Sequence, residues 1–301
     1  MKINEIDVLI TTRNRINDLC FTIDHCLSIG FGQDQIWIVD DNSTDDTSKI
    51  ISVKYHSVHL MTNKEPKGLI TNRNTLMFET NKDYILSLDD DSHIRTQEDI
   101  LDAIEVLESD PSYGIFHFHA FEQLHEPLAK TDLPDTVREI RTYIGCGHII
   151  KREVIKQLGK YREEFEFYCE ELDYSIRAYK AGYKVVTKDN LVVHHRLDVQ
   201  QRLKNHKEDL KKGISSTKYR SVLAFSNHLL IVYLHYPLSK QTPSILKICL
   251  LRFHRFFFRP SGPEAFFKGY QRFLRMKSTM NKYRETMSQS VFHEWKKKSI
   301  W

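Results

Sequence analysis

The stretch YILSLDDDSHIR, residues 84–95, decides the fold that we expect for this chain. Its apolar first half is typical of a buried strand, and it leads directly into three consecutive aspartates, Asp89, Asp90 and Asp91. An acidic turn that begins a helix would explain one or two of these acids, but three side by side repel one another. A divalent cation such as Mg²⁺ or Mn²⁺, which prefers carboxylate oxygens, removes that repulsion. The stretch therefore predicts a strand whose end holds a metal ion.

The residues around this stretch alternate between strand and helix patterns. We expect strands at 6–10, 36–40, 58–61, 84–88 and 114–118, and helices at 15–28, from about 45, at 69–80 and at 97–108. Strands separated by helices of this length predict an α/β fold, in which helices cover both faces of a mostly parallel sheet. Such sheets bind ligands at the carboxyl ends of their strands.

Polar clusters follow three of these strands. TTRNR (11–15) follows the first strand, DDNSTDDT (40–47) the second and DDD (89–91) the fourth. Asp, Asn and Ser form turns and helix caps, so the second cluster has a purely structural interpretation. It also provides carboxylates that accept hydrogen bonds from a base or a ribose, and the spacing leaves both interpretations open.

A further acidic group lies in CEELDYSIRAYKAGY, residues 169–183. The pattern is that of an amphipathic helix ending near Gly182, and a solvated helix is its structural interpretation. However, Glu170, Glu171 and Asp173 crowd one turn, and neighbouring carboxylates raise one another's affinity for a proton. A general base needs this property.

Charge divides the chain of 301 residues, whose net charge is +4, into two regions. Residues 1–200 hold 23 Lys/Arg and 35 Asp/Glu, a balance of −12, whereas residues 201–301 hold 21 and 5, a balance of +16. We therefore expect a catalytic domain at 1–200 and a basic, aromatic-rich helical region at 201–301.

The basic region predicts helices at 221–238 and 245–258, broken near Pro237 and Pro243. The second of these helices gathers basic side chains on one side and leucines and phenylalanines on the rest. Five cysteines without a CxxC pair, and no signal-peptide pattern at the N-terminus, predict a cytoplasmic protein with reduced thiols.

Taken in order, these patterns resemble glycosyltransferase family 2, inverting enzymes with the GT-A fold. The resemblance covers residues 5–196, and its matching stretches are VLITTRNR, VDDNSTDDT, GLITNRN, LSLDDDSHI, YIGCGHIIKREVIKQLGKY, EELDYSIRAYKAGY and VVHHR. Each stretch alone is a weak signal, but seven in the family's order are specific. The last hundred residues have no comparable match.

The resemblance assigns roles to individual residues. Around the donor nucleotide sugar it places Thr11, Thr12, Arg13, Asp40, Asp41, Arg73, Asp89, Asp90, Gly147 and His148. As metal ligands it implies Asp89 and Asp91, the two ends of the family's DxD motif, and we expect His194 to complete the site. Adjacent strand residues point to opposite faces, so His194 and His195 are not both expected there.

Glu171 matches the catalytic base of the family, with Glu170 and Asp173 beside it. This sequence has Glu-Glu where many relatives have Glu-Asp, which leaves open which carboxylate takes the proton. The implied reaction transfers a sugar, with inversion, from a nucleotide-diphosphate sugar to an acceptor hydroxyl, with Mn²⁺ or Mg²⁺ as cofactor.

The resemblance also implies partners. A UDP-sugar is the commonest donor in the family, and by analogy the acceptor is a saccharide or lipid-linked saccharide in bacterial surface polysaccharide or glycolipid synthesis. The basic region is then suited to binding the anionic inner face of the cell membrane.

Two alternative functions stay open. The first alternative is a phosphohydrolase with a DxDxT nucleophile loop, which Asp89 and Asp91 fit, but this motif requires Thr where the chain has His93. The second alternative is nucleic-acid binding through the basic region, whose aromatic residues could stack on bases. These residues are mostly phenylalanines spaced along an amphipathic helix, which suits a membrane surface better, so no nucleic-acid partner is expected.

Overall fold

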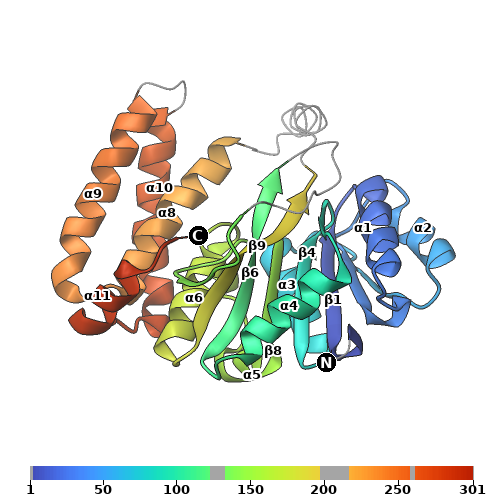
Figure 1. Cartoon of the computed structure of the whole chain (residues 1–301). Helices are drawn as coiled ribbons and strands as arrows, with labels where there is room; N and C mark the ends of the chain where they lie inside the picture. The colour runs from blue at the N-terminus through green and yellow to red at the C-terminus, as the bar shows by residue number, and fades with distance from the viewer. Residues whose placement is uncertain (1–2, 123–132, 197–216, 258–261, 301) are drawn as a thin grey trace. The chain divides into compact units, whose positions relative to one another are not determined.

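The computed structural model describes residues 3–122, 133–196, 217–257 and 262–300 (Figure 1). The chain forms two compact units, the first with residues 1–161, 177–197 and 299–301, and the second with residues 162–176 and 198–298. The segment 162–176, which the sequence groups with the catalytic domain, therefore belongs to the same compact unit as the C-terminal helices.

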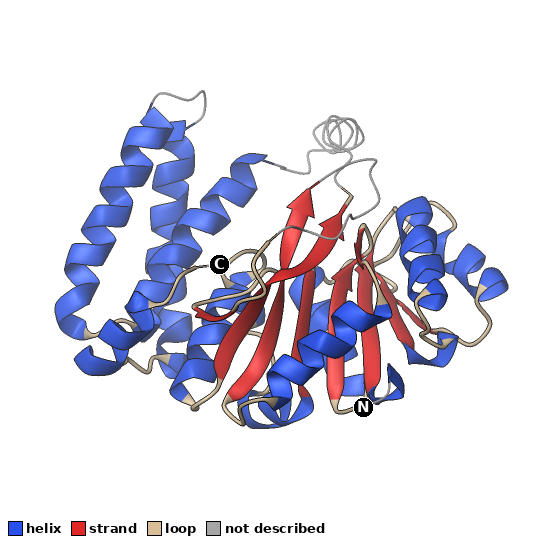
Figure 2. Ribbon diagram, in the orientation of Figure 1, coloured by secondary structure: helices blue, strands red, loops and turns tan. Residues whose placement is uncertain are grey.

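The first unit is built on a β-sheet, whose strands are red in Figure 2. The sheet has nine strands in the order β3-β2-β1-β4-β8-β6-β9-β5, and β7 pairs with β9. The strands are β1 Ile6–Thr12, β2 Ile36–Asp40, β3 His59–Thr62, β4 Tyr84–Asp89, β5 Ser92–Ile94, β6 Tyr113–Glu122, β7 Val137–Ile140, β8 Gly147–Lys151 and β9 Lys184–His195. β3, β2, β1 and β4 run parallel, as do β6 and β9, whereas β8 lies antiparallel between β4 and β6. The expected α/β class and mostly parallel sheet are confirmed.

Helices border this sheet. They are α1 Ile16–Ser28, α2 Thr47–Lys54, α3 Leu69–Glu79, α4 Gln97–Glu108 and α5 Arg152–Leu158. The main core lies where alternate residues of β1, such as Val8 and Ile10, pack with buried side chains of α1 and α4, such as Ile23 and Ile104. All five expected strands and all four expected helices of this region are present. β5 and β7 have three and four residues, too few for a periodic signal.

The second unit is helical. It contains α8 Thr217–His235, α9 Leu238–Phe257, α10 Gly262–Met280 and α11 Gln289–Lys297, and it also holds the first residues of α6 Glu170–Lys180 (Figure 1). Gly269 lets α10 approach α8 closely, because a Cβ there would lie 2.7 Å from Phe225 Cδ1 and 3.2 Å from the Val222 carbonyl oxygen.

Both helices expected in the basic region are present, but the break expected at Pro243 is wrong. α9 continues through this residue. Pro243 lies in the second turn of the helix, so its missing N–H removes one bond near the start and leaves the rest of α9 intact. Within the described ranges, no helix has the length and apolarity that crossing a bilayer requires.

Candidate functional site

The three aspartates form a tight turn between β4 and β5. Asp89 is the last residue of β4, and Ser92 begins β5. The backbone N–H of Asp89 donates to Ser92 Oγ over 2.9 Å, and that hydroxyl donates to the Cys146 carbonyl oxygen over 2.7 Å. The turn therefore places Asp89 and Asp91 at the carboxyl edge of the parallel strands, where the sequence predicts the ligand site.

Asp89, Asp91 and His195 come together at this edge. Their nearest ligand atoms all lie within 4.8 Å of one another. His195 Nε2 is 3.1 Å from Asp91 Oδ1, and His195 pairs in register with Ser92 across β5 and β9. Two carboxylates and an imidazole are the donor set that Mn²⁺ accepts, and the carboxylates also suit Mg²⁺. These residues therefore fit the divalent cation that the sequence predicts.

His194, which we expected at the metal, occupies a different place. It pairs in register with His93, and the two ring centroids are 4.9 Å apart. The His93 ring in turn lies 4.3 Å from the ring of His25 on α1. Adjacent residues of β9 point to opposite faces, so the structure directs His195 to Asp91 and His194 into this histidine cluster. The sequence alone could not distinguish these two orientations.

Two arginines hold the carboxylates of the turn. Arg15 Nη1 lies 2.9 Å from Asp90 Oδ1 and 2.8 Å from Asp91 Oδ2. Burial alone would lower the pKa of Arg15, but the Asp90 and Asp91 carboxylates outweigh burial and raise it. Arg73 on α3 is buried and donates to Asp89 Oδ1 over 3.1 Å.

From the sequence we expected Arg13, and not Arg15, at this site. Arg13 is exposed, whereas Arg15 reaches the aspartates. The signal was present in TTRNR, since both arginines precede a helix at the ligand edge, but no local pattern chooses between them.

Asp90 connects the turn to β1 and α1 through hydrogen bonds. Thr12 Oγ1 of β1 donates to Asp90 Oδ2 over 2.8 Å, and Thr22 Oγ1 of α1 donates to the Asp90 carbonyl oxygen over 2.7 Å. Burial raises the pKa of Asp90 to about 7, although the Arg15 guanidinium opposes the increase. Its contacts give Asp90 a structural role between its two neighbours.

Arg196, the residue directly after β9, supports the same turn, and its place in VVHHR did not reveal this contact. Its backbone N–H donates to the Asp91 carbonyl oxygen over 2.8 Å. Its Nη2 donates to Thr22 Oγ1 over 2.6 Å and to the Asp90 carbonyl oxygen over 3.2 Å. Arg196 therefore holds the backbone of the acidic turn at Asp90 and Asp91.

The residues of the DDNS cluster hold loops together. Asp40 accepts hydrogen bonds from the Ser43 backbone N–H at 2.9 Å and from Ser48 Oγ at 2.5 Å. The Asp41 carboxylate accepts from the backbone N–H groups of Lys67 at 2.7 Å and Gly68 at 3.0 Å. Burial alone would raise the pKa of Asp41. The hydrogen bonds from Asn72, Asn63 and these two amides outweigh burial, so the pKa is lowered overall. Asp41 thus fixes the start of α3, the helix that carries Arg73.

Gly147 and His148 begin β8 beside the acidic turn and are both buried. A Cβ at Gly147 would lie 2.7 to 2.8 Å from three side-chain atoms of Val193, so only glycine fits. Burial lowers the pKa of His148 well below its ordinary value, and the Arg73 charge lowers it further. His148 is therefore a neutral ring.

The proposed base and its neighbours have different environments, and all lie in the second unit. Asp173 is fully buried, and its carboxylate binds Arg162 Nη1 and His235 Nε2, the latter over 2.8 Å. Glu170 is also buried. Glu171 is the partly exposed member of the three, and hence the one that reaches solvent.

The loop before α6 is strained. Glu166, Tyr168 and Cys169 have φ angles of 61°, 69° and 70°, in the left-handed region that favours glycine. Each such residue costs of order 1–3 kcal/mol and persists only where surrounding contacts impose it. Strain of this kind gathers at functional sites.

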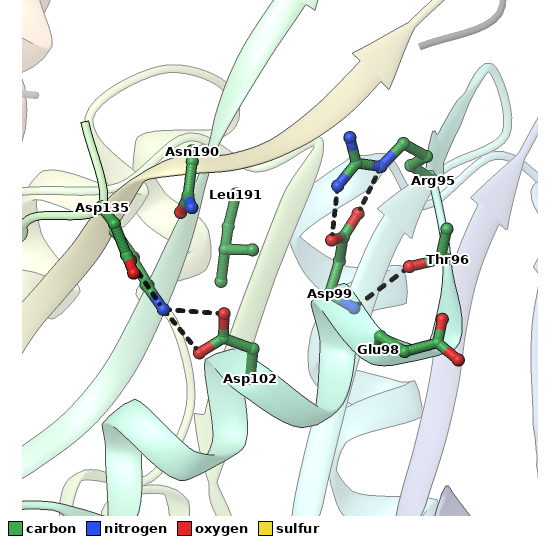
Figure 3. Close-up of a pocket in the computed structure, with 9 residues that line it drawn as sticks. Arg95, Thr96, Glu98, Asp99, Asp102, Asp135, Asn190 and Leu191 are labelled. Carbon is green, nitrogen blue, oxygen red and sulfur yellow. Dashed lines mark hydrogen bonds and ion pairs between the residues drawn. The ribbon is translucent and has the colours of Figure 1, made fainter. Parts of the chain in front are cut away.

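Figure 3 shows a pocket beside α4 and β9 that does not include the acidic turn. Inside it, Lys188 Nζ lies 2.8 Å from both Asp102 Oδ2 and Asp135 Oδ1. Arg95 donates to the Asp99 carboxylate over 2.9 and 2.7 Å. Because these charges pair with one another, we assign no ligand to this pocket.

The chain is similar to known glycosyltransferases. The family model described as Glycosyl transferase family 2 matches residues 7–159. No curated protein sequence matches the chain.

Three solved structures illustrate the similarity in fold. The mannosyltransferase PcManGT from Pyrobaculum calidifontis, in complex with GDP-Man and Mn²⁺, is 13% identical, with a TM-score of 0.55 over 97% of this chain and 79% of that one. GalNAc-T7 with UDP, GalNAc and Mn²⁺ is 14% identical, with a TM-score of 0.61 over 96% of this chain and 56% of that one. TarS from S. aureus is 13% identical, with a TM-score of 0.54 over 89% of this chain and 54% of that one. The chain spans little more than half the length of the last two, and their fold is that of GT-A glycosyltransferases.

Proposed function

The chain belongs to glycosyl transferase family 2, and from this premise we propose that it moves a sugar, with inversion, from a nucleotide-diphosphate sugar to an acceptor hydroxyl. The observation that carries the proposal is the convergence of Asp89, Asp91 and His195 at the carboxyl edge of the sheet. We propose a UDP-sugar as donor and a saccharide or lipid-linked saccharide as acceptor, in bacterial surface polysaccharide or glycolipid synthesis. Related folds that were solved with GDP-Man or UDP and with Mn²⁺ support this class of donor and cation.

Asp89, Asp91 and His195 would hold Mn²⁺ or Mg²⁺, in place of the set with His194 that we expected from the sequence. Such an ion neutralises the charge that develops on a leaving nucleoside diphosphate. The chain's own residues prepare the site. Arg73 orients the Asp89 carboxylate, and Arg15 orients that of Asp91. Thr11, Thr12, Arg13, Asp40, Asp41, Asp90, Gly147 and His148 remain our proposal for the donor's surroundings, with Thr12, Asp40, Asp41 and Asp90 acting through the loops that they hold.

We propose Glu171 as the general base that removes the acceptor proton. Its partial exposure supports this choice, because Asp173 is committed to Arg162 and His235. General-base catalysis contributes roughly 10²–10⁴-fold. One displacement that is assisted in this way inverts the anomeric centre.

Metal dependence tests the proposal directly. Sugar release and transfer are measured with a panel of nucleotide sugars, with Mn²⁺, with Mg²⁺ and with excess chelator. We expect activity only with a divalent cation, and an at least hundredfold loss in Asp91→Asn, which keeps the shape of the side chain but removes the charge that binds the metal. Asp24→Asn, which removes a charge of the same unit from a surface pair with Lys54, is the matched control and should behave as the wild type.

Full turnover of the wild type in excess chelator would contradict the metal site. Hydrolysis of phosphate monoesters without any sugar transfer would favour the phosphohydrolase alternative. The environment of His93 argues against that alternative, because its Nδ1 lies 2.7 Å from Arg196 Nη1 and its ring packs on two other histidines.

We also propose that the protein is cytoplasmic and that its second unit attaches to an anionic membrane surface, which would make it peripheral on the inner face of the cell membrane. The charge balance of residues 201–301 supports this, and so does the apolar surface of α9. Leu246, Leu250 and Leu251 are 57%, 70% and 58% exposed. Each basic residue near an anionic surface contributes about 1 kcal/mol of salt-sensitive attraction, and inserted apolar side chains add attraction that salt does not remove.

Vesicle flotation tests the membrane proposal. We expect the full chain to float with anionic vesicles at low salt, less at high salt, and not with neutral vesicles. The double variant Leu250→Glu and Leu251→Glu should float less, whereas Phe78→Glu, at an exposed phenylalanine of the first unit, should float like the wild type. Absence of flotation at low salt would leave α9 as an interface with another protein or another copy. Phe253 of α9 is also exposed, and we propose that it inserts together with these leucines, whereas the side chains of Phe256 and Phe257 lie outside the described residues.

A further inference from the structure

The loop that leads into α6 adopts a conformation that its own sequence does not favour. Three of its non-glycine residues have positive φ angles, and the Phe167 backbone N–H donates to the Phe165 carbonyl oxygen over 2.6 Å, closing a tight turn at Glu166. Such a turn with positive φ is rare and strained. The loop therefore needs contacts from outside itself to keep this shape.

Asn227 of α8 supplies these contacts. Its side chain is fully buried, and its Nδ2 donates to the carbonyl oxygens of Phe165 at 2.8 Å, Phe167 at 2.9 Å and Tyr168 at 2.9 Å. An amide nitrogen has two hydrogens, so both are engaged and one is shared between two carbonyls. One side chain thus binds three backbone carbonyl groups of the strained loop.

Arg272 of α10 fixes the direction of that amide. Its Nη1 donates to Asn227 Oδ1 over 2.8 Å, which leaves the amide nitrogen facing the loop. Its Nη2 donates to the Glu164 carbonyl oxygen and to Glu166 Oε1, both over 2.9 Å. The buried guanidinium therefore holds the loop both directly and through Asn227.

We propose that Asn227, oriented by Arg272, is a positioning residue for the catalytic base, and that α8 and α10 take part in sugar transfer in this way. The connection is short, because α6 begins at Glu170, directly after the loop, and the Asp173 backbone N–H donates to the Cys169 carbonyl oxygen over 2.9 Å in its first turn. The shape of the loop therefore sets where the helix starts and where Glu171 lies. This inference rests on the role proposed above for Glu171.

The variant Asn227→Ala tests the proposal in the full chain. A misplacement of about 1 Å costs on the order of 10²-fold in rate, so we expect a 10- to 100-fold fall in kcat with the donor KM within threefold of the wild type. Gln241→Ala is the matched control. Gln241 is also an amide of the second unit, and its Nε2 donates to the carbonyl oxygens of Tyr233 and Tyr236, away from the loop. It should leave both parameters unchanged. Arg272→Lys keeps the charge but loses the planar fork, and it should show a smaller fall in kcat, which tests the proposal again if Asn227→Ala folds poorly.

Hydrogen exchange provides a readout that does not depend on activity. Exchange of the amides of residues 165–171 should become faster in Asn227→Ala and stay unchanged in Gln241→Ala. Unchanged exchange in this segment, or a kcat within threefold of the wild type, would overturn the inference. If the wild type transfers no sugar from any nucleotide sugar, the proposed function and the catalytic part of this inference both fail, whereas the exchange result still decides whether Asn227 holds the loop.

Discussion

Glu171 and Asp173 lie two residues apart on α6, and the structure predicts opposite consequences when each loses its charge. Asp173 is fully buried between Arg162 and His235, whereas Glu171 is partly exposed. We therefore expect Glu171→Gln to impair catalysis and Asp173→Asn to impair stability.

The magnitudes follow from these environments. Removing one partner of a buried ion pair costs about 3–5 kcal/mol, because the remaining charge stays buried. Asn still accepts a hydrogen bond, so we expect about 3 kcal/mol for Asp173→Asn, or a fall of roughly 6–12 °C in the melting temperature of a chain of this size. Glu171→Gln should change the melting temperature by less than about 2 °C and lower kcat roughly 10²–10⁴-fold.

The assay combines thermal unfolding with steady-state kinetics below the melting temperature of every variant. Because a base acts on the acceptor in the transition state, kcat should fall in Glu171→Gln while the donor KM stays unchanged. Glu264→Gln, on an exposed pair with Lys268 of α10, is the matched control for loss of one glutamate charge. An Asp173→Asn variant as stable as the wild type but inactive, together with an active Glu171→Gln variant, would refute this reasoning and move the proton to Asp173.

Two further predictions concern the first unit. Burial lowers the pKa of His117 to about 3, so the folded chain keeps this ring neutral while the unfolded chain protonates it below about 6.5. Stability is therefore lost as pH falls, by about 2 kcal/mol between pH 7 and pH 5, and urea unfolding of His117→Phe should show a pH dependence weaker by this amount. Equal pH dependence in both chains would contradict the neutral buried ring. Gly147→Ala forces a Cβ within 2.8 Å of Val193 and should cost about 1–3 kcal/mol, so a melting temperature within 1 °C of the wild type would show that β8 can move away.

The strands and the acidic turn were predictable because their signals are local. β1, β2 and β4 are apolar runs that end in polar clusters, and a parallel sheet brings such ends to one edge. Position along the chain was enough to predict that Asp89 and Asp91 reach the ligand edge. The pairing of β4 with β8 was not predictable in this way, because an antiparallel strand inserted into a parallel sheet has no sequence period of its own.

The support around the metal residues was missed because it comes from distant parts of the chain. Arg15 directly precedes α1 and Arg196 directly follows β9, and they lie 75 and 106 residues away from Asp90 in the sequence. The sequence around each of these two arginines does not distinguish it from an ordinary surface arginine. The choice of His195 over His194 depends on the register of β9 against β5, which is a property of the sheet and not of VVHHR.

The position of Glu171, the proposed base, was the hardest feature of the site to predict from the sequence. The family match ends at residue 159, so it covers the acidic turn but not Glu171. The compact unit that contains Glu171 is made largely of residues 198–298, for which the sequence offers no family pattern. If the catalytic base depends on Asn227 and Arg272, these helices cannot be an interchangeable tail. Replacing them with a tail of equal charge should then abolish transfer, even where the donor and the cation still bind. Transfer that survives such an exchange would instead show that the first unit and the start of α6 hold the base without them.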